Sequence, residues 1–440
     1  MLTGSVAVHS LEARLHRVRD LLLRWGAAEK LAILSICLIY LLHSIWAART
    51  VMWFFVVPVV LLSVTSYRRL APIVTSGVFV MTAAYLLLII ITTMLGDSLP
   101  GKELFSQFRY TVAILFFIIV IAYLTWADDR FVPRLFMWLA PVAAFAAVRD
   151  IGSFSGWSLH TMLTTRLQGT PGLSIYYNSN VIGMLYAMSC VGAVALMTTR
   201  RLPSWQSVML FSCALILLVA TTMTGSRGSL LAATMGILAS LLLKPSWRAA
   251  ILAVSVLAVV AVVTLLMPVI GQWMASGGVQ STSLPVEMVQ RGDSTRLELW
   301  PEYLKMAALK PWLGYGLAFD TQVTLPSGKQ VMNAHNMFLC AAVRGGVFSA
   351  LALAGIVLAA FASGWRGFRR TGEMMGLALL VSCLAATSVD YEILPTDLNY
   401  FYVLIWLPVA ICLGLGLAPC SRTVSGVTRS QGVVPSQNRS

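Results

Sequence analysis

The sequence predicts an all-α fold, a polytopic transmembrane helix bundle of about 12 spans with one large, partly helical outer loop. Of the 440 residues, 58% are hydrophobic and only 11% are charged, whereas a soluble domain carries roughly 25% charged residues. Apolar runs recur between residues 31 and 418, and many reach the roughly 18 residues that cross the ~30 Å hydrocarbon core as a helix. Basic residues also concentrate in alternate connections, as membrane topology requires.

The expected spans follow one another in chain order. The second, fifth and eighth are the weakest, because they are short or closely abut their neighbours. The spans lie near residues 31–48, 51–66, 71–95, 108–126, 133–148, 180–199, 206–223, 229–243, 248–270, 337–362, 373–389 and 399–418. The chain then divides into an amphipathic N-terminal segment (1–30), the first nine spans (31–270), the long outer loop (271–336), the last three spans (337–418) and a tail expected to be disordered (419–440).

The distribution of Lys and Arg predicts that both termini are cytoplasmic. Most of the 31 basic residues lie in the N-terminal segment, in the short connections of one face and in the tail. The outer face holds fewer, and half of those belong to the long loop, which counts little in the charge rule. The net charge of +14 is therefore a topology signal. It does not indicate a nucleic-acid partner, because the small basic clusters lie at span ends, where membrane lipids bind them.

Several kinds of site are missing from the sequence. The seven cysteines lie within spans or just after the last one, so they form neither a disulfide framework nor a metal site. The outer loops contain no Asp-x-Asp pair, and the chain has no P-loop, no Ser-His-Asp arrangement and no carboxylate pair at glycosidase spacing. We therefore expect no metal and no cofactor. If the chain binds a phosphate group, arginine side chains must then neutralise its charge.

Two outer connections are longer than a simple turn. The first, residues 149–179, has a Gly/Ser-rich part, contains Arg166 and leads into Asn180. Tyr176, Tyr177, Asn178 and Asn180 are candidates for a sugar-binding edge, although Gly and aromatic residues in such loops are usually architectural. The second, residues 271–336, is the largest polar segment of the chain. A loop of this size is more often functional than ornamental.

The second part of the long loop is predicted to be helical. Thr295 and Glu298 form a T-x-x-E capping box, and apolar residues then recur at helical spacing. Lys310-Pro311 ends this helix, and Trp312-Leu-Gly314-Tyr315-Gly316 forms a glycine-punctuated turn.

Arg227 lies between glycines in Gly225-Ser-Arg-Gly-Ser229, where two apolar runs meet. An ordinary interfacial arginine that reaches lipid head groups is the alternative interpretation. A ligand-binding role is favoured because the glycines permit close approach and because the charge rule disfavours arginine on this face.

Arg296 lies in the first turn of the predicted loop helix. It could be a solvated surface residue. Helix starts prefer acidic side chains, however, and a basic residue there is better explained if an anion docks at that N-terminus.

His335 lies in Asn-Ala-His-Asn336, where the long loop meets the next apolar run. A hydrogen-bonded interfacial histidine is the ordinary alternative. Histidine is also the usual general base near neutral pH, and the flanking asparagines can fix its tautomer or hold sugar hydroxyls.

Two further groups lie near the same face. Arg344, two helical turns beyond His335, could reach the same cavity. Asp390 belongs to the acidic cluster at a span end of the outer face, where it either orients a histidine or an arginine or is simply solvated. The candidate substrate-binding residues are therefore Asn336, Arg344, Asp390, Tyr315, Asn180 and Arg166.

The ordered motifs resemble the O-antigen ligase and O-antigen polymerase superfamily. The resemblance covers about residues 220–346, and upstream only the multi-span pattern agrees. It is carried by Ser226-Arg227-Gly228, by Arg296…Trp300 with Lys310-Pro311…Gly314-Tyr315-Gly316, and by Ala334-His335-Asn336…Leu339 with Arg344-Gly345-Gly346. Size, span count and the single large loop are most similar to the ligases that complete lipopolysaccharide.

This resemblance implies a metal-independent, inverting glycosyl transfer at the periplasmic face of the bacterial inner membrane. The implied donor is a glycan on undecaprenyl pyrophosphate, and the implied acceptor is lipid A–core oligosaccharide. His335 matches the essential histidine of the family and becomes the general base. Arg227 and Arg296 match the two arginines that hold the pyrophosphate.

Other functions stay open at this stage. An O-antigen polymerase would use the same arginines with a second polyprenyl-linked glycan as acceptor, and a pilin-glycosylating ligase is a further member of the superfamily. A secondary transporter or flippase belongs to a different class. It would more naturally carry charged or broken spans near mid-membrane, whereas here the notable residues lie at the outer edge.

Overall fold

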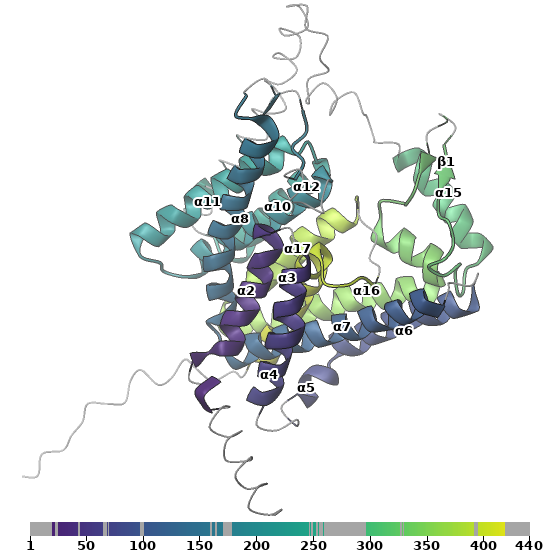
Figure 1. Ribbon diagram of the computed structural model, residues 1–440, viewed down its shortest axis with the longest axis horizontal. Helices are drawn as coiled ribbons and strands as arrows, with labels where there is room; N and C mark the ends of the chain where they lie inside the picture. The colour runs from purple at the N-terminus through teal and green to yellow at the C-terminus, as the bar shows by residue number, and fades with distance from the viewer. Residues whose placement is uncertain are drawn as a thin grey trace, which may run out of the picture.

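A computed structural model of the chain shows an almost entirely helical protein (Figure 1). It describes residues 20–22, 25–42, 45–64, 70–96, 101–158, 161–162, 165–169, 178–245, 296–325, 330–390 and 395–418, with a few single positions between them. The expected ninth span, the N-terminal segment before residue 20, the first half of the long loop and the tail lie largely outside these ranges.

The elements follow in chain order. They are α2 (Ala27–Leu41), α3 (Ile45–Thr50), η1 (Val51–Val56), α4 (Val57–Ser63), α5 (Ala71–Val74), α6 (Gly77–Leu95), α7 (Gly101–Ala127), α8 (Phe131–Ser155), α10 (Ser179–Thr199), α11 (Ser204–Met223), α12 (Arg227–Leu243), α15 (Arg296–Leu309), α16 (Met337–Thr371), α17 (Met375–Thr387), η3 (Tyr402–Trp406) and α18 (Leu407–Leu417). A short antiparallel hairpin, β1 (Val323–Thr324) with β2 (Gln330–Val331), pairs Val323 with Val331.

Among the described residues, 7 helices are long and apolar enough to cross a membrane. They comprise Trp46–Ser63, Gly77–Leu95, Glu103–Ala127, Phe131–Ser155, Ser179–Thr199, Ser204–Met223 and Met337–Thr371, and the shorter apolar helices are Arg227–Leu243, Met375–Thr387 and Tyr402–Leu417. The expected all-α, polytopic membrane fold is therefore confirmed. The exact number of spans stays a prediction.

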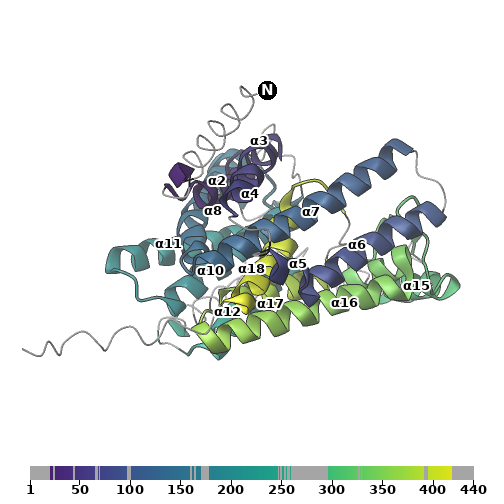
Figure 2. The ribbon, with the colours of Figure 1, turned by 90° about the horizontal axis from the view of Figure 1, so that it is seen from below.

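The helices cross at steep angles. Figures 1 and 2 show α6, α7 and α16 running along one another, while α2, α3 and α8 stand across them. Helix α10 packs against α8, α11, α12 and α17, and its apolar stretch is completely buried within the protein. An almost continuous apolar core results, and a smaller second core joins α15 and the hairpin to the start of α16.

Two apolar helices pass a proline after a π-helical segment. Pro58 lies within the expected second span, and the helix continues from Ile45 to Ser63. A π-helical segment, η1, directly precedes Pro58, and η3 precedes Pro408 in the same way. Proline lacks an N–H donor and clashes with the preceding turn of an α-helix. A wider turn before it relieves that conflict.

Helix ends that are expected on the same side of the membrane are joined to one another by hydrogen bonds and ion pairs. On the face predicted to be cytoplasmic, Arg134 contacts Glu29 at 2.7 Å and Arg200 contacts Glu373 at 3.4 Å. Burial raises the pKa of the Glu373 carboxyl, and nearby Arg200 opposes that shift. On the predicted outer face, the Leu317 backbone N–H donates to the Thr93 hydroxyl at 3.1 Å. These contacts agree with the expected grouping of connections, and the cytoplasmic assignment stays a prediction.

Helix α16 is kinked at Gly346, whose φ of 70° and ψ of −171° are not helical. The kink removes helical partners from the neighbouring backbone, and the turn after α15 replaces them. Val347 N–H donates to the Pro311 carbonyl at 2.7 Å, and the N–H groups of Tyr315 and Gly316 donate to the Val343 and Arg344 carbonyls at 2.9 and 2.7 Å.

The glycines of this region are explained by close backbone contact. A Cβ on Gly346 would lie 2.1 Å from the Trp312 carbonyl oxygen, and one on Gly314 would lie 2.5 Å from that of Val343. On the other side, a Cβ on Gly316 would lie 2.9 Å from the Thr92 carbonyl oxygen. The glycine-punctuated turn is thus inserted between α6 and α16.

Gly346→Ala is expected to lower the free energy of unfolding by at least about 2 kcal/mol, because left-handed backbone strain adds to a clash with a carbonyl. Gly372→Ala is the matched control, since Gly372 has the same φ of 70° with nothing within 4 Å of the added Cβ. Denaturant unfolding of the purified protein in detergent measures both. Equal losses for the two variants would show that the turn does not constrain the kink.

Candidate active site

The segment around His335 is fixed by two asparagine side chains. The Asn333 carboxamide oxygen accepts a hydrogen bond from the His335 N–H at 3.0 Å. The Asn336 oxygen caps α16 by accepting from the Phe338 and Leu339 N–H groups, and its amide donates to the Ser388 carbonyl at 3.0 Å. Between them, His335 has a φ of 50°. Left-handed backbone is unusual outside glycine and often marks a functional site.

The His335 ring faces Asp390. Its Nδ1 atom lies 3.3 Å from the Asp390 Oδ1 and 3.4 Å from the Asp390 carbonyl oxygen. Both neighbours accept hydrogen bonds, so we assign the proton of the neutral ring to Nδ1. The Nε2 lone pair is then left to accept a proton. His335 keeps 33% of its side-chain surface exposed, which leaves it accessible to a ligand.

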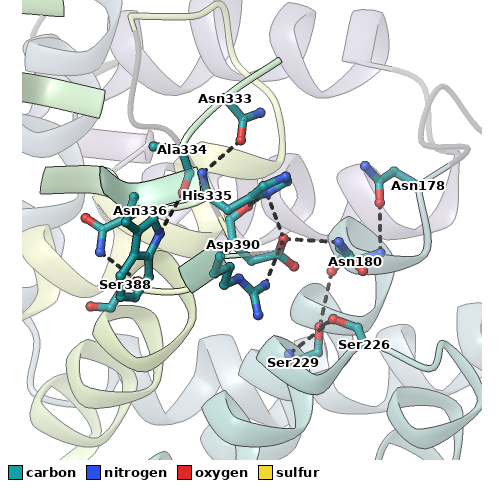
Figure 3. A network of polar contacts seen from close by, with 12 residues as sticks. Asn178, Asn180, Ser226, Ser229, Asn333, Ala334, His335, Asn336, Ser388 and Asp390 are labelled. Carbon is teal, nitrogen blue, oxygen red and sulfur yellow. Dashed lines mark hydrogen bonds and ion pairs between the residues drawn. The ribbon is translucent and has the colours of Figure 1, made fainter. Parts of the chain in front are cut away.

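Asp390 is the centre of the cluster (Figure 3). Its side chain is only 5% exposed and follows the end of α17. Besides His335, the Asn180 amide of α10 donates to Oδ1 at 3.1 Å, and the Arg296 guanidinium of α15 lies 3.9 Å away. A buried carboxylate needs such partners, because an unpaired charge away from water is strongly unfavourable.

Helix α15 positions Arg296 through its packing on α16. The Trp300 indole N–H donates to the Ala334 carbonyl at 3.0 Å, directly before His335. Tyr303 is fully buried and donates to the Thr321 carbonyl at 2.6 Å. Arg296 is the first described residue of α15, and the Thr295 of the predicted capping box lies outside the described residues. The predicted helix is present, and its first turn faces the cluster.

Arg227 begins α12 at the edge of the same cluster. Ser226 caps this helix by accepting from the Ser229 N–H at 3.3 Å. The next residue, Gly228, packs against Asp390, since a Cβ added to it would lie 3.4 Å from Asp390 Cβ and Oδ2. The Arg227 side chain is exposed. The start of α12 thus meets a carboxylate that lies 163 residues beyond Arg227 in the chain.

Arg166 and Asn180 form a supporting layer behind Asp390. Arg166 donates through Nη2 to the Asn180 oxygen and through Nε to the Thr224 carbonyl, both at 2.8 Å. The Ser229 hydroxyl donates to the Asn180 carbonyl at 3.2 Å. These bonds tie the first outer connection to the ends of α10, α11 and α12, and they orient the Asn180 amide toward Asp390.

Arg344 and Tyr315 lie away from this cluster. Arg344 is 9% exposed and donates to the Leu317 and Phe319 carbonyls at 3.0 and 2.7 Å. Tyr315 stacks on Phe319 with 4.1 Å between ring centroids, and the Lys310 ammonium lies 4.5 Å over the Tyr315 ring. Both side chains hold the turn after α15 in shape. We therefore assign them to the support of the kink in α16.

The arrangement brings one imidazole, one buried carboxylate and the Arg296 guanidinium together, with the start of α12 and its Arg227 beside them. Ordinary sequence features do not reveal that Asp390 connects them, because its partners come from four distant segments. Its position at an outer span end was the only signal available. The neighbouring acidic residue Glu392 lies outside the described residues. Within the described ranges, no group of three or more His, Cys, Asp or Glu side chains could hold a metal ion.

Comparison with known proteins agrees with this geometry. The sequence profile of the O-antigen ligase family matches residues 212–354, the segment that carries Arg227, Arg296 and His335. An O-antigen ligase of Pseudomonas aeruginosa is 30% identical over 132 residues, which are 30% of this chain and 33% of that protein. The match thus spans about one third of the relative's length. Over residues 212–354, the chain is therefore similar to the O-antigen ligase family.

Proposed function

We propose that this multi-pass membrane protein is an O-antigen ligase. It transfers O-antigen polysaccharide from undecaprenyl pyrophosphate to lipid A–core oligosaccharide at the periplasmic face of the bacterial inner membrane. The match of residues 212–354 to the O-antigen ligase family supports an enzyme of the O-antigen ligase or polymerase type. The observation that carries the mechanism is the meeting of His335, Arg296, Asn180 and the start of α12 at the Asp390 carboxylate.

In this mechanism His335 is the general base. The acceptor hydroxyl donates its proton to Nε2 while its oxygen attacks the anomeric carbon of the donor. The bond from that carbon to the pyrophosphate oxygen breaks, and attack from the opposite face inverts the anomeric centre. Asp390, at 3.3 Å from Nδ1, orients the ring and stabilises the imidazolium that forms. A positioned base of this kind contributes about 10²–10⁴-fold in rate.

Arg227 and Arg296 hold the pyrophosphate without a divalent ion. A guanidinium presents two parallel N–H donors that match phosphate oxygens. Fixed cations stabilise the leaving group most as its charge grows, because they need no reorganisation during the reaction. Arg296 is kept near Asp390 by the packing of α15, and Arg227 extends from a helix whose next residue contacts Asp390. The two arginines therefore flank the base from different helices.

The first prediction concerns the substrates. Purified protein with polyprenyl-pyrophosphate glycan and lipid A–core should form the joined glycolipid, with chelator present and only when both substrates are supplied. Mass-resolved gel analysis of the lipid products measures this. Lengthening of the donor alone would select a polymerase instead, and the absence of any glycosyl transfer would contradict both enzymes.

The second prediction concerns the His335–Asp390 pair. His335→Ala should lower kcat by about 10²–10⁴-fold. Asp390→Asn should lower it by more than about tenfold, because the ring loses its orienting carboxylate. In the His335→Ala background, most of the Asp390→Asn cost should disappear, since residues that act as a unit are not additive. A double variant whose loss of kcat equals the product of the two single losses would rule out a role of Asp390 through His335.

The third prediction concerns the geometry of Arg227. Arg227→Lys keeps the charge but loses the planar fork, and it should lower kcat/KM by about 10–10²-fold. Steady-state kinetics with varied donor measures this. Arg201→Lys is the matched control, because Arg201 is an exposed arginine between α10 and α11 on the opposite face. If the Arg227→Lys variant were as active as the Arg201→Lys control, Arg227 would be interpreted as a residue that contacts lipid head groups.

A further inference from the structure

A second group of cations lies on the outer face, apart from His335. Arg49 at the end of α3 contacts Asp397 with 3.1 Å between Nη1 and Oδ2, and its Nε donates to the Leu398 carbonyl at 3.4 Å. Arg109 of α7 approaches the same Oδ2 atom at 3.9 Å. We call Arg49 and Arg109 the outer arginine pair. Among the described residues, one carboxylate contacts both guanidiniums, so this group of three side chains carries a net positive charge.

The outer arginine pair is held in place and partly open. Asp397 accepts from the Leu398 N–H at 2.8 Å and is 18% exposed, whereas Arg109 is 59% exposed. The carboxylate holds the Arg49 guanidinium at 3.1 Å, whereas the Arg109 guanidinium lies beyond hydrogen-bond distance and is largely exposed. Planar guanidinium forks match phosphate oxygens. A bound anion would supply the second negative charge that Arg49 and Arg109 lack at Asp397.

Aromatic residues place the pair at the membrane boundary. Trp46 is 74% exposed and lies under Arg49, with 5.8 Å from Cζ to the ring centroid. On α7, Phe105 and Phe108 are exposed on the same side of the chain as Arg109. Exposed aromatic side chains beside arginine are typical of the level of the lipid head groups. An anion that reaches this site is therefore expected to belong to a lipid.

Arg109 is held less firmly than other arginines of the predicted outer face. Arg149 contacts Asp150 at 3.0 Å and also the Leu41 carbonyl, and Arg166 contacts Asn180 and Thr224. These contacts, like those of Arg49, join elements within the protein. The Arg109 guanidinium instead lies 3.9 Å from its carboxylate and is largely exposed, so it can turn toward a ligand.

The pair is also within reach of the candidate active site. Asp397 follows Asp390 by 7 positions in the chain, and a fully extended segment of that length spans at most about 25 Å. A lipid-anchored substrate that holds a phosphate at Asp397's arginines can therefore present a sugar several units away to His335. The donor needs no such second contact, since its pyrophosphate is taken by Arg227 and Arg296.

We propose that the outer arginine pair binds a phosphate group on the lipid anchor of the acceptor. This inference rests on the proposed function, because it assumes a glycolipid acceptor that reaches His335. The pair sets the distance between the acceptor's membrane anchor and the base, and it selects phosphorylated acceptors. It is a binding site for the substrate and takes no part in bond breaking.

The test compares lipid A–core with the same acceptor after removal of its lipid-anchor phosphates. With wild-type protein, the phosphorylated acceptor should have the lower KM, by about tenfold, as expected for one charged hydrogen-bonding contact. Arg109→Gln should raise the KM for the phosphorylated acceptor by about tenfold and abolish the difference, while the KM for the donor stays the same. Arg109→Lys should retain part of the difference.

Arg369→Gln is the control, because Arg369 is an exposed arginine at the end of α16 on the opposite face. Binding is measured separately by the rise in unfolding temperature when acceptor is added without donor, so the inference is tested even if no transfer occurs. Loss of that rise in Arg109→Gln supports the pair. An Arg109→Gln protein that still distinguishes the two acceptors overturns it, as does equal stabilisation of wild-type protein by phosphatidylglycerol.

Discussion

The Asp390 carboxylate is buried where α10, α12, α15, α16 and α17 come together, and its charge sets the conditions for everything around it. Taking a carboxylate out of water costs several kcal/mol unless it is paired and hydrogen bonded. Here the partners are the imidazole of His335, the amide of Asn180 and the guanidinium of Arg296. The same interaction that makes burial tolerable therefore fixes the direction of the histidine ring. It also holds segments together that are separated by more than 200 residues.

The supporting structure follows from this constraint. Arg166 anchors Asn180 from behind, so the amide donor cannot turn away from the carboxylate without breaking the 2.8 Å contact between Arg166 and the Asn180 oxygen. Arg166 is itself held by the Thr224 carbonyl at 2.8 Å. Asn333 and Asn336 fix the backbone on both sides of His335. Trp300 links α15 to the residue directly before the histidine. Each polar residue near the site is thus committed to orientation, which is the property that a base and an anion site both require.

The fold class could be predicted because it depends on local properties, and the same properties predict one face for Arg227, Arg296 and His335. Apolar run length and the distribution of Lys and Arg need no knowledge of helix packing. The central role of Asp390 could not be derived in this way, since it depends on which helix ends meet. Arg344 shows the same limit. Its spacing from His335 is helical, but the kink at Gly346 and the turn after α15 bring backbone carbonyls to its guanidinium instead.

The kink divides α16 into two mechanically different parts. Beyond Gly346 the helix is embedded in the apolar bundle, whereas the portion from Met337 to Gly345 is braced by backbone bonds to the turn at Pro311–Gly316. That turn also leans on the end of α6 through Thr93. The backbone direction of this short arm, which begins directly after His335 and Asn336, is consequently set by the turn as well as by the span that follows it. A sequence change in the turn would therefore act first on the arm next to His335, and would reach the helix beyond it only through the kink at Gly346.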